Sequence, residues 1–351
     1  MNGGPNVLVA RLDSLGDVLL AGPAVRAVAA GAREVTLMSG PRGRAAAELL
    51  PGVDRVVEFA APWIDPEPQA VERERVLAAA DDLAKLRIDR AIVLTSFHQS
   101  ALPTAFLLRL AGVPLIAAIS EEYPGSLLDV RHRLDDDVHE VERGLSLVAA
   151  AGFALPDGDD AALRVRLPAN APVHPFEGEP YVVVHPGTSV PARAWDPARH
   201  AELVEELVRG GRHVAVTGSE HERALTAFVC SAATPGVVDL GGRLSFGELG
   251  HLLAGADAVI VGNTGPAHLA AAVGTPVVSL YAPTVPAVRW SPWRVPHVLL
   301  GRQDAPCANT RVTVCPFEGH PCLNEVTVRD VIGAVESLAP QGDGEQHEAV
   351  A

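Results

Sequence analysis

The chain of 351 residues is longer than one hydrophobic core usually supports, so we expect two domains of about 150 residues each. Its formal net charge of −15 argues against a nucleic-acid-binding protein, because affinity for a phosphate backbone depends on Lys and Arg side chains. Hydrophobic residues make up 48% and charged residues 20% of the chain, which is typical of a folded globular protein.

In the first half of the chain, short β-branched runs alternate with longer Ala- and Leu-rich segments. A helix is predicted at residues 17–30, and strands are predicted at residues 7–11, 34–38, 90–95 and 115–119. This alternation is typical of β-α units around a parallel sheet. We therefore expect residues 1–170 to form a Rossmann-like domain.

The first strand and helix are joined by the turn RLDSLGD at residues 11–17. The loop at the carboxyl end of such a strand faces the ligand crevice, so Asp13 and Asp17 are candidates for proton transfer. Gly16 permits an unusual backbone angle or the close approach of a substrate. The alternative is that Ser14 or Asp17 only caps the helix.

Residues 155–180 are rich in Pro, Asp, Asn and Gly, a composition typical of a linker. Beyond them the alternating pattern returns. Strands are predicted at residues 181–185, 213–217, 237–239, 258–262 and 277–281, and helices at residues 197–209, 220–232, 246–255 and 266–273. We expect a second Rossmann-like domain at residues 171–335, a cleft between the two domains, and a flexible tail at residues 336–351.

The second candidate site is the segment HPGTS at residues 185–189, which follows a predicted strand. Backbone N–H groups beside the glycine, the hydroxyls of Thr188 and Ser189, and the guanidinium of Arg193 would together form a cradle for a diphosphate. The alternative is an ordinary Gly/Pro turn.

The third candidate site is the segment VGNTGPAHLAAA at residues 261–272. A helix is expected to begin near Pro266, because proline suits the first helical turn. The N–H groups of Thr264 and Gly265 would then point into the crevice beside the positive helix end, where a phosphate binds well. His268 could add a hydrogen-bond donor, although a lone His in an Ala-rich helix is often only a packed residue.

Taken in order, these segments resemble glycosyltransferase family 9. The resemblance lies in LDSLGDVLLAGPAVRA, in VVVHPGTSVPARAW with TGSEHERA after it, and in GNTGPAHLAAAVGTPVVSLYAPT, and it spans most of the chain. The best-known members of the family are the ADP-heptose:lipopolysaccharide heptosyltransferases. The resemblance implies an α/β fold of GT-B architecture and an inverting, metal-independent glycosyltransferase. It places the acceptor in the first domain and the nucleotide-sugar donor in the second.

The resemblance also implies roles for individual residues. Asp17 matches the position of the catalytic base, and Asp13 and Gly16 become candidates on the acceptor side. Arg193 stands where heptosyltransferases generally have a phosphate-binding lysine, and Arg keeps the charge with a different geometry. Glu222 lies near the position that binds the ribose. The remaining donor-binding candidates are Thr188, Ser189, Asn263, Thr264, Gly265 and His268, with Asn263 replacing the Asp that heptosyltransferases commonly have.

We expect no cofactor apart from the nucleotide-diphosphate sugar, with an ADP-sugar favoured, and no catalytic metal, because no Asp-x-Asp segment accompanies the donor turn. The acceptor would be a glycan or a small molecule. Cys307, Cys315 and Cys322, with His320 nearby, lack the standard spacing of a zinc finger, so scattered reduced cysteines are the favoured interpretation. Trp290 and Trp293 would either rim the cleft or pack a loop.

The expected location is the cytoplasm, because charged residues interrupt the apolar stretch near the amino end and no basic segment precedes it. We expect a monomer with no nucleic-acid partner, which touches the inner membrane face if its acceptor is lipid-linked. Two other functions stay open: a GT-B nucleotide-sugar epimerase and a non-catalytic nucleotide-sugar-binding protein. An NAD-dependent oxidoreductase is disfavoured, because the first turn lacks G-x-G-x-x-G.

Overall fold

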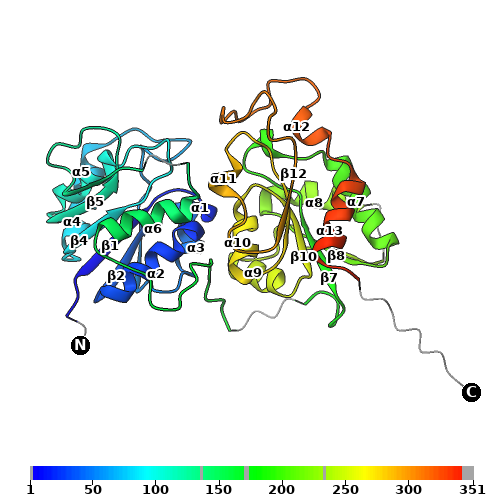
Figure 1. Ribbon diagram of the computed structural model, residues 1–351, viewed down its shortest axis with the longest axis horizontal. Helices are drawn as coiled ribbons and strands as arrows, with labels where there is room; N and C mark the ends of the chain where they lie inside the picture. Colours follow the sequence, from blue (N-terminus) through cyan, green and yellow to red (C-terminus); the bar gives the residue numbers. More distant parts are fainter. Residues whose placement is uncertain (1–2, 135–136, 170–173, 232–234, 342–351) are drawn as a thin grey trace, which may run out of the picture.

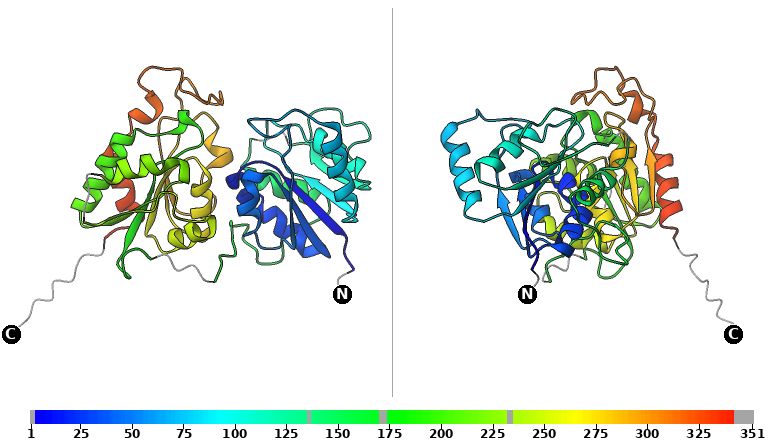
Figure 2. Two further views of the ribbon diagram at one scale, coloured as in Figure 1. Left: turned by 180° about the vertical axis from the view of Figure 1, so that it is seen from behind. Right: turned by 60° about the vertical axis from the view of Figure 1, so that its left-hand side comes forward.

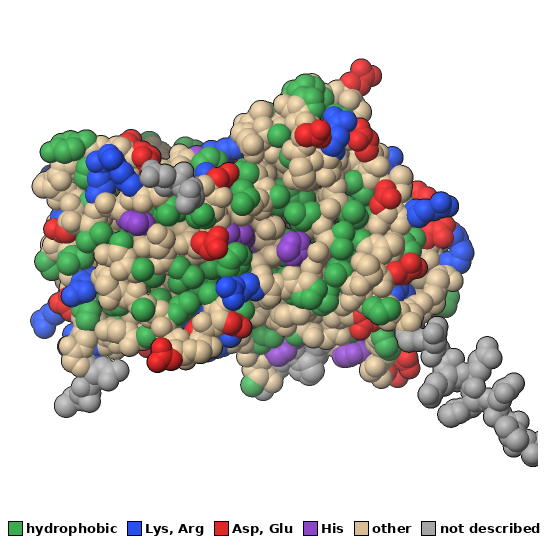
Figure 3. Space-filling view, in the orientation of Figure 1, with side chains coloured by type: hydrophobic (Ala, Val, Ile, Leu, Met, Phe, Trp, Pro, Cys, Tyr) green, Lys and Arg blue, Asp and Glu red, His purple; other side chains and the backbone are tan. Residues whose placement is uncertain are grey.

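The chain forms two six-stranded parallel sheets, each in its own lobe (Figures 1 and 2). The computed structural model describes residues 3–134, 137–169, 174–231 and 235–341. Within these ranges no helix combines the length and the apolar character that a membrane span requires. On the face shown in Figure 3, charged side chains of both signs are scattered rather than gathered into one basic patch.

The first sheet has the strand order β3-β2-β1-β4-β5-β6. Its strands are β1 (Asn6–Arg11), β2 (Glu34–Ser39), β3 (Arg55–Glu58), β4 (Arg90–Val93), β5 (Leu115–Ile119) and β6 (Val130–His132). Its helices are α1 (Leu15–Leu20), α2 (Gly22–Gly31), α3 (Arg44–Ala47), α4 (Arg73–Ala84), α5 (Leu102–Leu110) and α6 (Glu140–Ala150), with the 3-10 turn η1 (Pro41–Gly43).

The second sheet has the strand order β12-β11-β10-β7-β8-β9. Its strands are β7 (Tyr181–His185), β8 (His213–Val216), β9 (Val237–Asp239), β10 (Ala258–Gly262), β11 (Val277–Leu280) and β12 (His297–Leu300). Its helices are α7 (Pro197–Arg209), α8 (Arg223–Cys230), α9 (Phe246–Ala254), α10 (Gly265–Val273), α11 (Ala287–Trp290), α12 (Pro321–Asn324) and α13 (Val328–Leu338), with the 3-10 turns η2 (Pro191–Arg193) and η3 (Glu220–Glu222).

Counted from its own first strand, each sheet has the same order, 3-2-1-4-5-6. The direction of the chain connections therefore changes between β1 and β4 in the first sheet and between β7 and β10 in the second. Open parallel sheets bind ligands outside the carboxyl ends of the strands at such switch points. All the residues of β7 and β10 are buried, as expected of central parallel strands that helices cover on both faces.

Several elements predicted from the sequence are confirmed to the residue, among them β5, β7, β9, β10 and α7. The single helix predicted at residues 17–30 is wrong: it is two helices, α1 and α2. Pro23 has no N–H group to continue the hydrogen-bond ladder, so the chain begins a new helix there.

Other sequence-based boundaries need correction. The predicted helix at residues 220–232 opens as the 3-10 turn η3 before α8, and residue 232 lies outside the described residues. The expected domain end after residue 335 falls inside α13, whose buried Val331 and Val335 tie it to the second domain. Of the predicted tail, residues 342–351 lie outside the described residues.

The segment that leaves the first domain is anchored to α2 by a buried ion pair. Arg26 Nε and Nη2 donate to the two carboxylate oxygens of Asp159 at 2.7 and 2.8 Å, and Nη2 also donates to the carbonyl of Ala162. The hydrogen bonds from Arg26 hold the pKa of Asp159 far below its usual range. The extended segment after α6 therefore begins from a fixed point.

This anchor generates a stability prediction. The Asp159→Asn substitution should lower the free energy of unfolding at pH 7 by about 1.5–3 kcal/mol, because Arg26 loses a charged partner. Since folding lowers the pKa of Asp159, its contribution is full above about pH 4 and is lost as the pH falls further. Urea unfolding at pH 7 and pH 3 measures both effects. The exposed neighbour Asp160, changed to Asn, should alter the free energy of unfolding much less, because water screens its ion pair with Arg164. Equal effects of the two substitutions would contradict the anchor.

Candidate active site

The turns that follow β1 and β10 meet where the two domains touch. A Cβ atom built at Gly16 would lie 2.8 Å from His268 Cδ2, and one built at Gly265 would lie 3.6 Å from the backbone nitrogen of Gly16. A side chain at Gly16 would therefore press on the second domain. The first and third candidate sites of the sequence thus form one junction, to which Gly16 contributes by close approach.

Asp17 lies in the first turn of α1, with 18% of its side chain exposed. Its Oδ1 accepts a hydrogen bond from Arg11 Nη2 at 2.9 Å, and its Oδ2 accepts one from Ser14 Oγ at 2.7 Å. Burial alone would raise the pKa of this carboxyl, but the Arg11 guanidinium and the Ser14 hydroxyl bring it below the ordinary value. Asp17 is therefore a carboxylate anion held in one orientation. The capping interaction with Ser14, raised as the alternative, is present as well.

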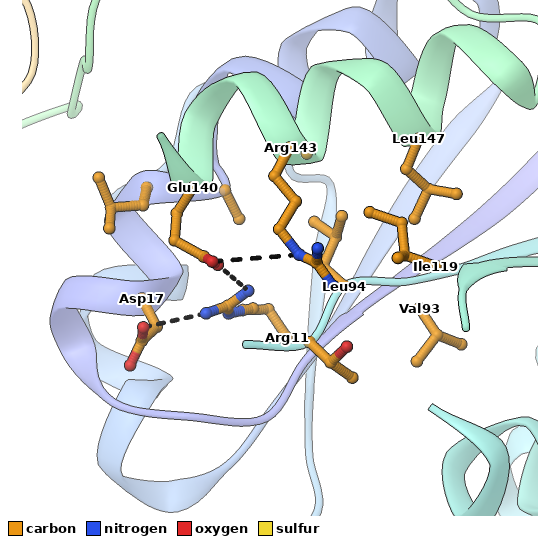
Figure 4. A pocket seen from close by; sticks show the side chains of 12 residues that line it. Arg11, Asp17, Val93, Leu94, Ile119, Glu140, Arg143 and Leu147 are labelled. Carbon is orange, nitrogen blue, oxygen red and sulfur yellow. Dashed lines mark hydrogen bonds and ion pairs between the residues drawn. The ribbon is translucent and has the colours of Figure 1, made fainter. Parts of the chain in front are cut away.

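Arg11, the last residue of β1, is the cation at the centre of this site (Figure 4). Besides Asp17 it contacts Asp13 Oδ2 through Nε at 3.0 Å, Glu140 Oε2 through Nη1 at 3.3 Å and Ser96 Oγ through Nη2 at 2.9 Å. The guanidinium is 5% exposed. Sequence reasoning missed both Arg11 and Glu140. A charge at the end of an apolar strand was the available signal for Arg11, whereas no local pattern marks Glu140.

Asp13 occupies a different environment from Asp17. Its Oδ1 accepts a hydrogen bond from Gln99 Nε2, and only 7% of the residue is exposed. Burial raises the pKa of Asp13, the attraction of Arg11 opposes this, and the negative charge of Asp17 adds to it. Two neighbouring carboxyls thus have pKa shifts of opposite sign, and Asp17 is the one that keeps its charge.

His268 lies on the first turn of α10 and is buried, with its ring against Gly16. Burial lowers its pKa to about 4, with His139 adding to the effect and Asp17 opposing it. The imidazole is therefore neutral at pH 7. Its Nδ1 atom is buried and has no hydrogen-bond partner within the described ranges, so it is not a satisfied core histidine.

The donor turn at residues 263–265 differs in part from expectation. The amide of Thr264 donates to the carbonyl of Gly262 at 2.9 Å, so the prediction that it points freely into the crevice is wrong. The tight bend before α10 uses this N–H group within the turn. The Gly265 amide opens α10 without a hydrogen-bond partner in the part of the chain described. Asn263 Oδ1 is buried and also lacks a partner there.

Arg193 reaches this turn from η2 in the same domain. Its Nε donates to Thr284 Oγ1 at 3.3 Å and its Nη1 donates to the carbonyl of Asn263 at 3.4 Å. Burial lowers the pKa of Arg193, while Tyr281 and Asp17 oppose the shift. Arg193 is therefore held against the turn at residues 263–265 of the second domain.

The remaining donor-binding candidates lie around the segment HPGTS. Thr188 Oγ1 donates to the carbonyl of Val190 at 2.9 Å and so stabilises the turn, while Ser189 is exposed. Glu222 lies against the turn, since a Cβ atom at Gly187 would lie 1.9 Å from Glu222 Oε1. Glu222 Oε2 accepts hydrogen bonds from the amide and hydroxyl of Ser219, which caps η3. The nucleotide contacts of these residues stay predictions.

Contacts across the junction involve residues that sequence reasoning did not assign. Arg289 lies over the ring of Phe97 at 4.0 Å from its centroid and pairs with Asp137. Arg311 Nη2 and His98 Nε2 are 2.7 Å apart, and burial together with Arg311 lowers the pKa of His98 to about 4. The loop after β4 is therefore joined to the second domain.

The sequence left open whether Trp290 and Trp293 rim a cleft or pack a loop. Trp293 packs between the two domains. Its Nε1 donates to the carbonyl of Ala161 at 2.8 Å, and its ring stacks on His139 with centroids 4.4 Å apart. His139 Nε2 lies 3.0 Å from the carbonyl oxygen of Ser291. Trp290 packs on Phe97 with centroids 5.5 Å apart. Both tryptophans thus hold the two domains together beside the site.

The cysteine-rich loop, residues 307–322, contains Arg311 but brings none of its thiols into the contacts described above. Cys307 and Cys322 are buried, Cys315 is half-buried, and His320 Nε2 lies 3.1 Å from the carbonyl oxygen of Ala192. Burial and the neighbouring thiols raise the pKa of Cys322 to about 12, so it stays a thiol. The described residues contain no group of three or more His, Cys, Asp or Glu side chains arranged to hold a metal ion.

Known proteins resemble this chain in sequence. Lipopolysaccharide heptosyltransferase 3 of Escherichia coli is 31% identical over 170 residues, which are 48% of this chain and 49% of that protein. Lipopolysaccharide heptosyltransferase 1 of Pseudomonas aeruginosa is 33% identical over 233 residues, which are 63% of this chain and 62% of that protein. The matched segments thus span less than two thirds of either relative.

Solved structures resemble the chain over nearly its whole length. A glycosyl transferase of family 9 from Veillonella parvula has a TM-score of 0.77 at 18% identity, covering 97% of this chain and 98% of the other. The E. coli ADP-heptose LPS heptosyltransferase II has a TM-score of 0.74 at 21% identity, covering 95% and 98%. These similarities confirm the predicted α/β fold of GT-B architecture.

The family model described as glycosyltransferase family 9 (heptosyltransferase) matches residues 68–320. This match covers well over half of the chain and includes the second and third candidate sites. The chain therefore belongs to glycosyltransferase family 9, the family that its three motifs predicted.

Proposed function

We propose that this chain transfers a heptose from ADP-heptose to a hydroxyl group of a glycan or small-molecule acceptor. The observation that carries the proposal is the junction, where the turn that contains Gly16 and Asp17 packs against His268 and Gly265 at the start of α10. The family and its lipopolysaccharide heptosyltransferases support heptose as the sugar. The E. coli heptosyltransferase WaaC is described with ADP, which supports an adenine nucleotide.

In the proposed reaction Asp17 acts as the general base. It takes the proton of the acceptor hydroxyl while that oxygen bonds to the anomeric carbon of the heptose. The bond from this carbon to the diphosphate oxygen breaks on the opposite face, and its electron pair leaves with ADP. The configuration at the anomeric carbon is therefore inverted. Because Arg11 and Ser14 keep Asp17 ionised, the base is ready at neutral pH.

The leaving diphosphate would be stabilised by groups of the second domain. Arg193 provides a cation, the Gly265 amide opens α10 at its positive end, and the neutral His268 provides a ring nitrogen. Donors preorganised where charge develops can replace a metal ion in this role. We therefore propose a metal-independent reaction.

We further propose that the protein works as a monomer in the cytoplasm. The names of its relatives point to lipopolysaccharide or lipooligosaccharide acceptors, which are lipid-linked, so we propose contact with the inner membrane face during transfer. The cysteines within the described ranges are free thiols, which agrees with a reducing compartment.

The proposed base generates the first functional prediction. The Asp17→Asn variant should fold and bind ADP as the wild type does, but its turnover should fall at least ~100-fold, because the amide cannot accept the proton. Product formation is measured by mass spectrometry with ADP-heptose and a panel of saccharide acceptors. The exposed Asp160→Asn variant is the control and should keep full turnover. Near-normal turnover of Asp17→Asn would show that Asp17 is not the base and would make Asp13 the first candidate.

Donor binding generates the second prediction. The Arg193→Ala variant loses a charge-assisted contact and should bind ADP more weakly by about 1.5–3 kcal/mol, as measured by titration calorimetry. Arg209→Ala, on the exposed end of α7, is the matched control and should bind normally. Unchanged affinity in Arg193→Ala would place the diphosphate elsewhere.

The third prediction concerns metal ions. Activity should survive exhaustive EDTA treatment, because Arg193 and the start of α10 meet the charge of the diphosphate. A loss restored by Mg²⁺ or Mn²⁺ would refute the proposed mechanism, whereas slow inactivation reversed only by Zn²⁺ would indicate a structural site at the cysteines.

The same assays separate the alternative functions. Conversion of the donor sugar without an acceptor would indicate an epimerase. Tight donor binding without turnover across the acceptor panel would indicate a non-catalytic binding protein.

A further inference from the structure

Arg11 faces more negative charge than it can neutralise. Its single guanidinium contacts Asp13, Asp17 and Glu140, whose side chains are 8%, 18% and 1% exposed. Arg143, the next cation, lies 4.0 Å from the other carboxylate oxygen of Glu140, and its Nε atom has no hydrogen-bond partner among the described residues. The three carboxylates therefore compete for one well-placed cation.

We propose that Arg11 is a positioning residue that keeps Asp17 ionised and fixes its orientation, and that Glu140 acts against it, because its carboxylate contacts the same guanidinium and repels that of Asp17. This inference rests on the proposed role of Asp17 as the base. Arg11 itself lies behind Asp17, at the end of a buried strand, so it acts through that carboxylate.

The other groups that face Asp17 do not replace Arg11. They are Asp13 and Glu140 from the first domain, His98 from the loop after β4, and Arg193 and His268 from the second domain. The two carboxylates oppose ionisation of Asp17, and the two histidines are neutral at pH 7. Arg193 belongs to the second domain, where the diphosphate would occupy it. Arg11 is thus the cation that Asp17 keeps throughout the reaction.

The two partners of this network should shift the pKa of Asp17 in opposite directions. Loss of Arg11 removes the attraction that offsets burial, so the pKa of Asp17 rises. Loss of the charge of Glu140 removes a repulsion and frees the guanidinium, so the pKa of Asp17 falls. A merely structural role of Arg11 would not give this opposition, because damage to the packing does not by itself remove a positive or a negative charge that acts on Asp17.

The test is ¹³C NMR of the whole protein labelled at the aspartate carboxyl carbons. The Asp17 signal is assigned by its absence in Asp17→Asn. In the wild type it should not titrate between pH 4.5 and 8. In Arg11→Met its midpoint should rise by about 1–3 pH units, and in the double variant Arg11→Met with Glu140→Gln it should return by about 1 unit. Arg26→Met is the matched control, because Arg26 is also buried and ion-paired but pairs with Asp159.

If Arg11→Met does not fold, the Arg11→Lys variant tests the inference instead. Lysine keeps the charge but loses the planar fork that bonds several oxygens at once. Asp17 should therefore stay ionised in this variant. Its kcat should fall about 10²-fold with the KM for the donor unchanged, because the orientation of the Asp17 carboxylate is no longer fixed. In Arg11→Met, the acid limb of kcat/KM should move upward together with the NMR midpoint.

The inference is overturned if Arg11→Met leaves the Asp17 signal as in the wild type, if the double variant titrates no lower than Arg11→Met, or if Arg11→Lys keeps full kcat. The NMR titration separates this inference from the proposed function. A wild-type protein that transfers no heptose, yet shows the expected midpoints, would refute the function and leave the charge network standing.

Discussion

The contact between the turn after β1 and the start of α10 is the constraint on which the site depends. At this contact the first domain has Gly16, and the second has Gly265 and the ring of His268. Any Cβ at Gly16 would meet this ring at 2.8 Å. Because Gly16 and Gly265 carry no side chain, the turn that contains Asp17 in one domain can lie beside the start of α10 in the other.

The buried charge network around Asp17 is unfavourable for the free energy of folding. Moving a guanidinium and three carboxylates out of water is unfavourable, and such groups often stabilise a protein less than apolar residues of the same size would. Glu140 Oε1 even lacks a hydrogen-bond partner within the described ranges. The large apolar sheets and helices around the network supply the stability. The arrangement is therefore better understood as setting the charge and direction of Asp17 than as holding the first domain together.

The site forms between the two domains rather than within one because of the topology of the sheets. Each sheet has its switch point at the same place in its strand order, so each offers a crevice at the carboxyl ends of its central strands. The contacts of Phe97, His98 and His139 with residues 289–311 join the two domains near these strand ends. One domain then presents the proposed base, and the other presents a cation and a helix end.

Much of this could be predicted from the sequence, because it depends on local pattern. Buried parallel strands are continuous apolar runs, so β1 is predicted to within one residue and β7 and β10 to the residue. The segments that follow these three strands contain Asp17, Arg193 and His268, respectively. Short or exposed elements such as β3, β6 and β12 carry no comparable signal and were missed. The break at Pro23 could have been predicted from its missing N–H group, but the apolar pattern continues through it.

The tertiary structure alone decided which of these residues act on one another. Glu140 reaches Arg11 across 129 positions, and Trp293 stacks on His139 across the domain junction. No periodicity in the chain encodes such pairs, since they arise when separate helices pack at one place. The same holds for charge: a lone Asp13 and a lone Asp17 look alike in the sequence. Their pKa values are shifted in opposite directions because Arg11 and Ser14 bond to Asp17, while burial dominates at Asp13.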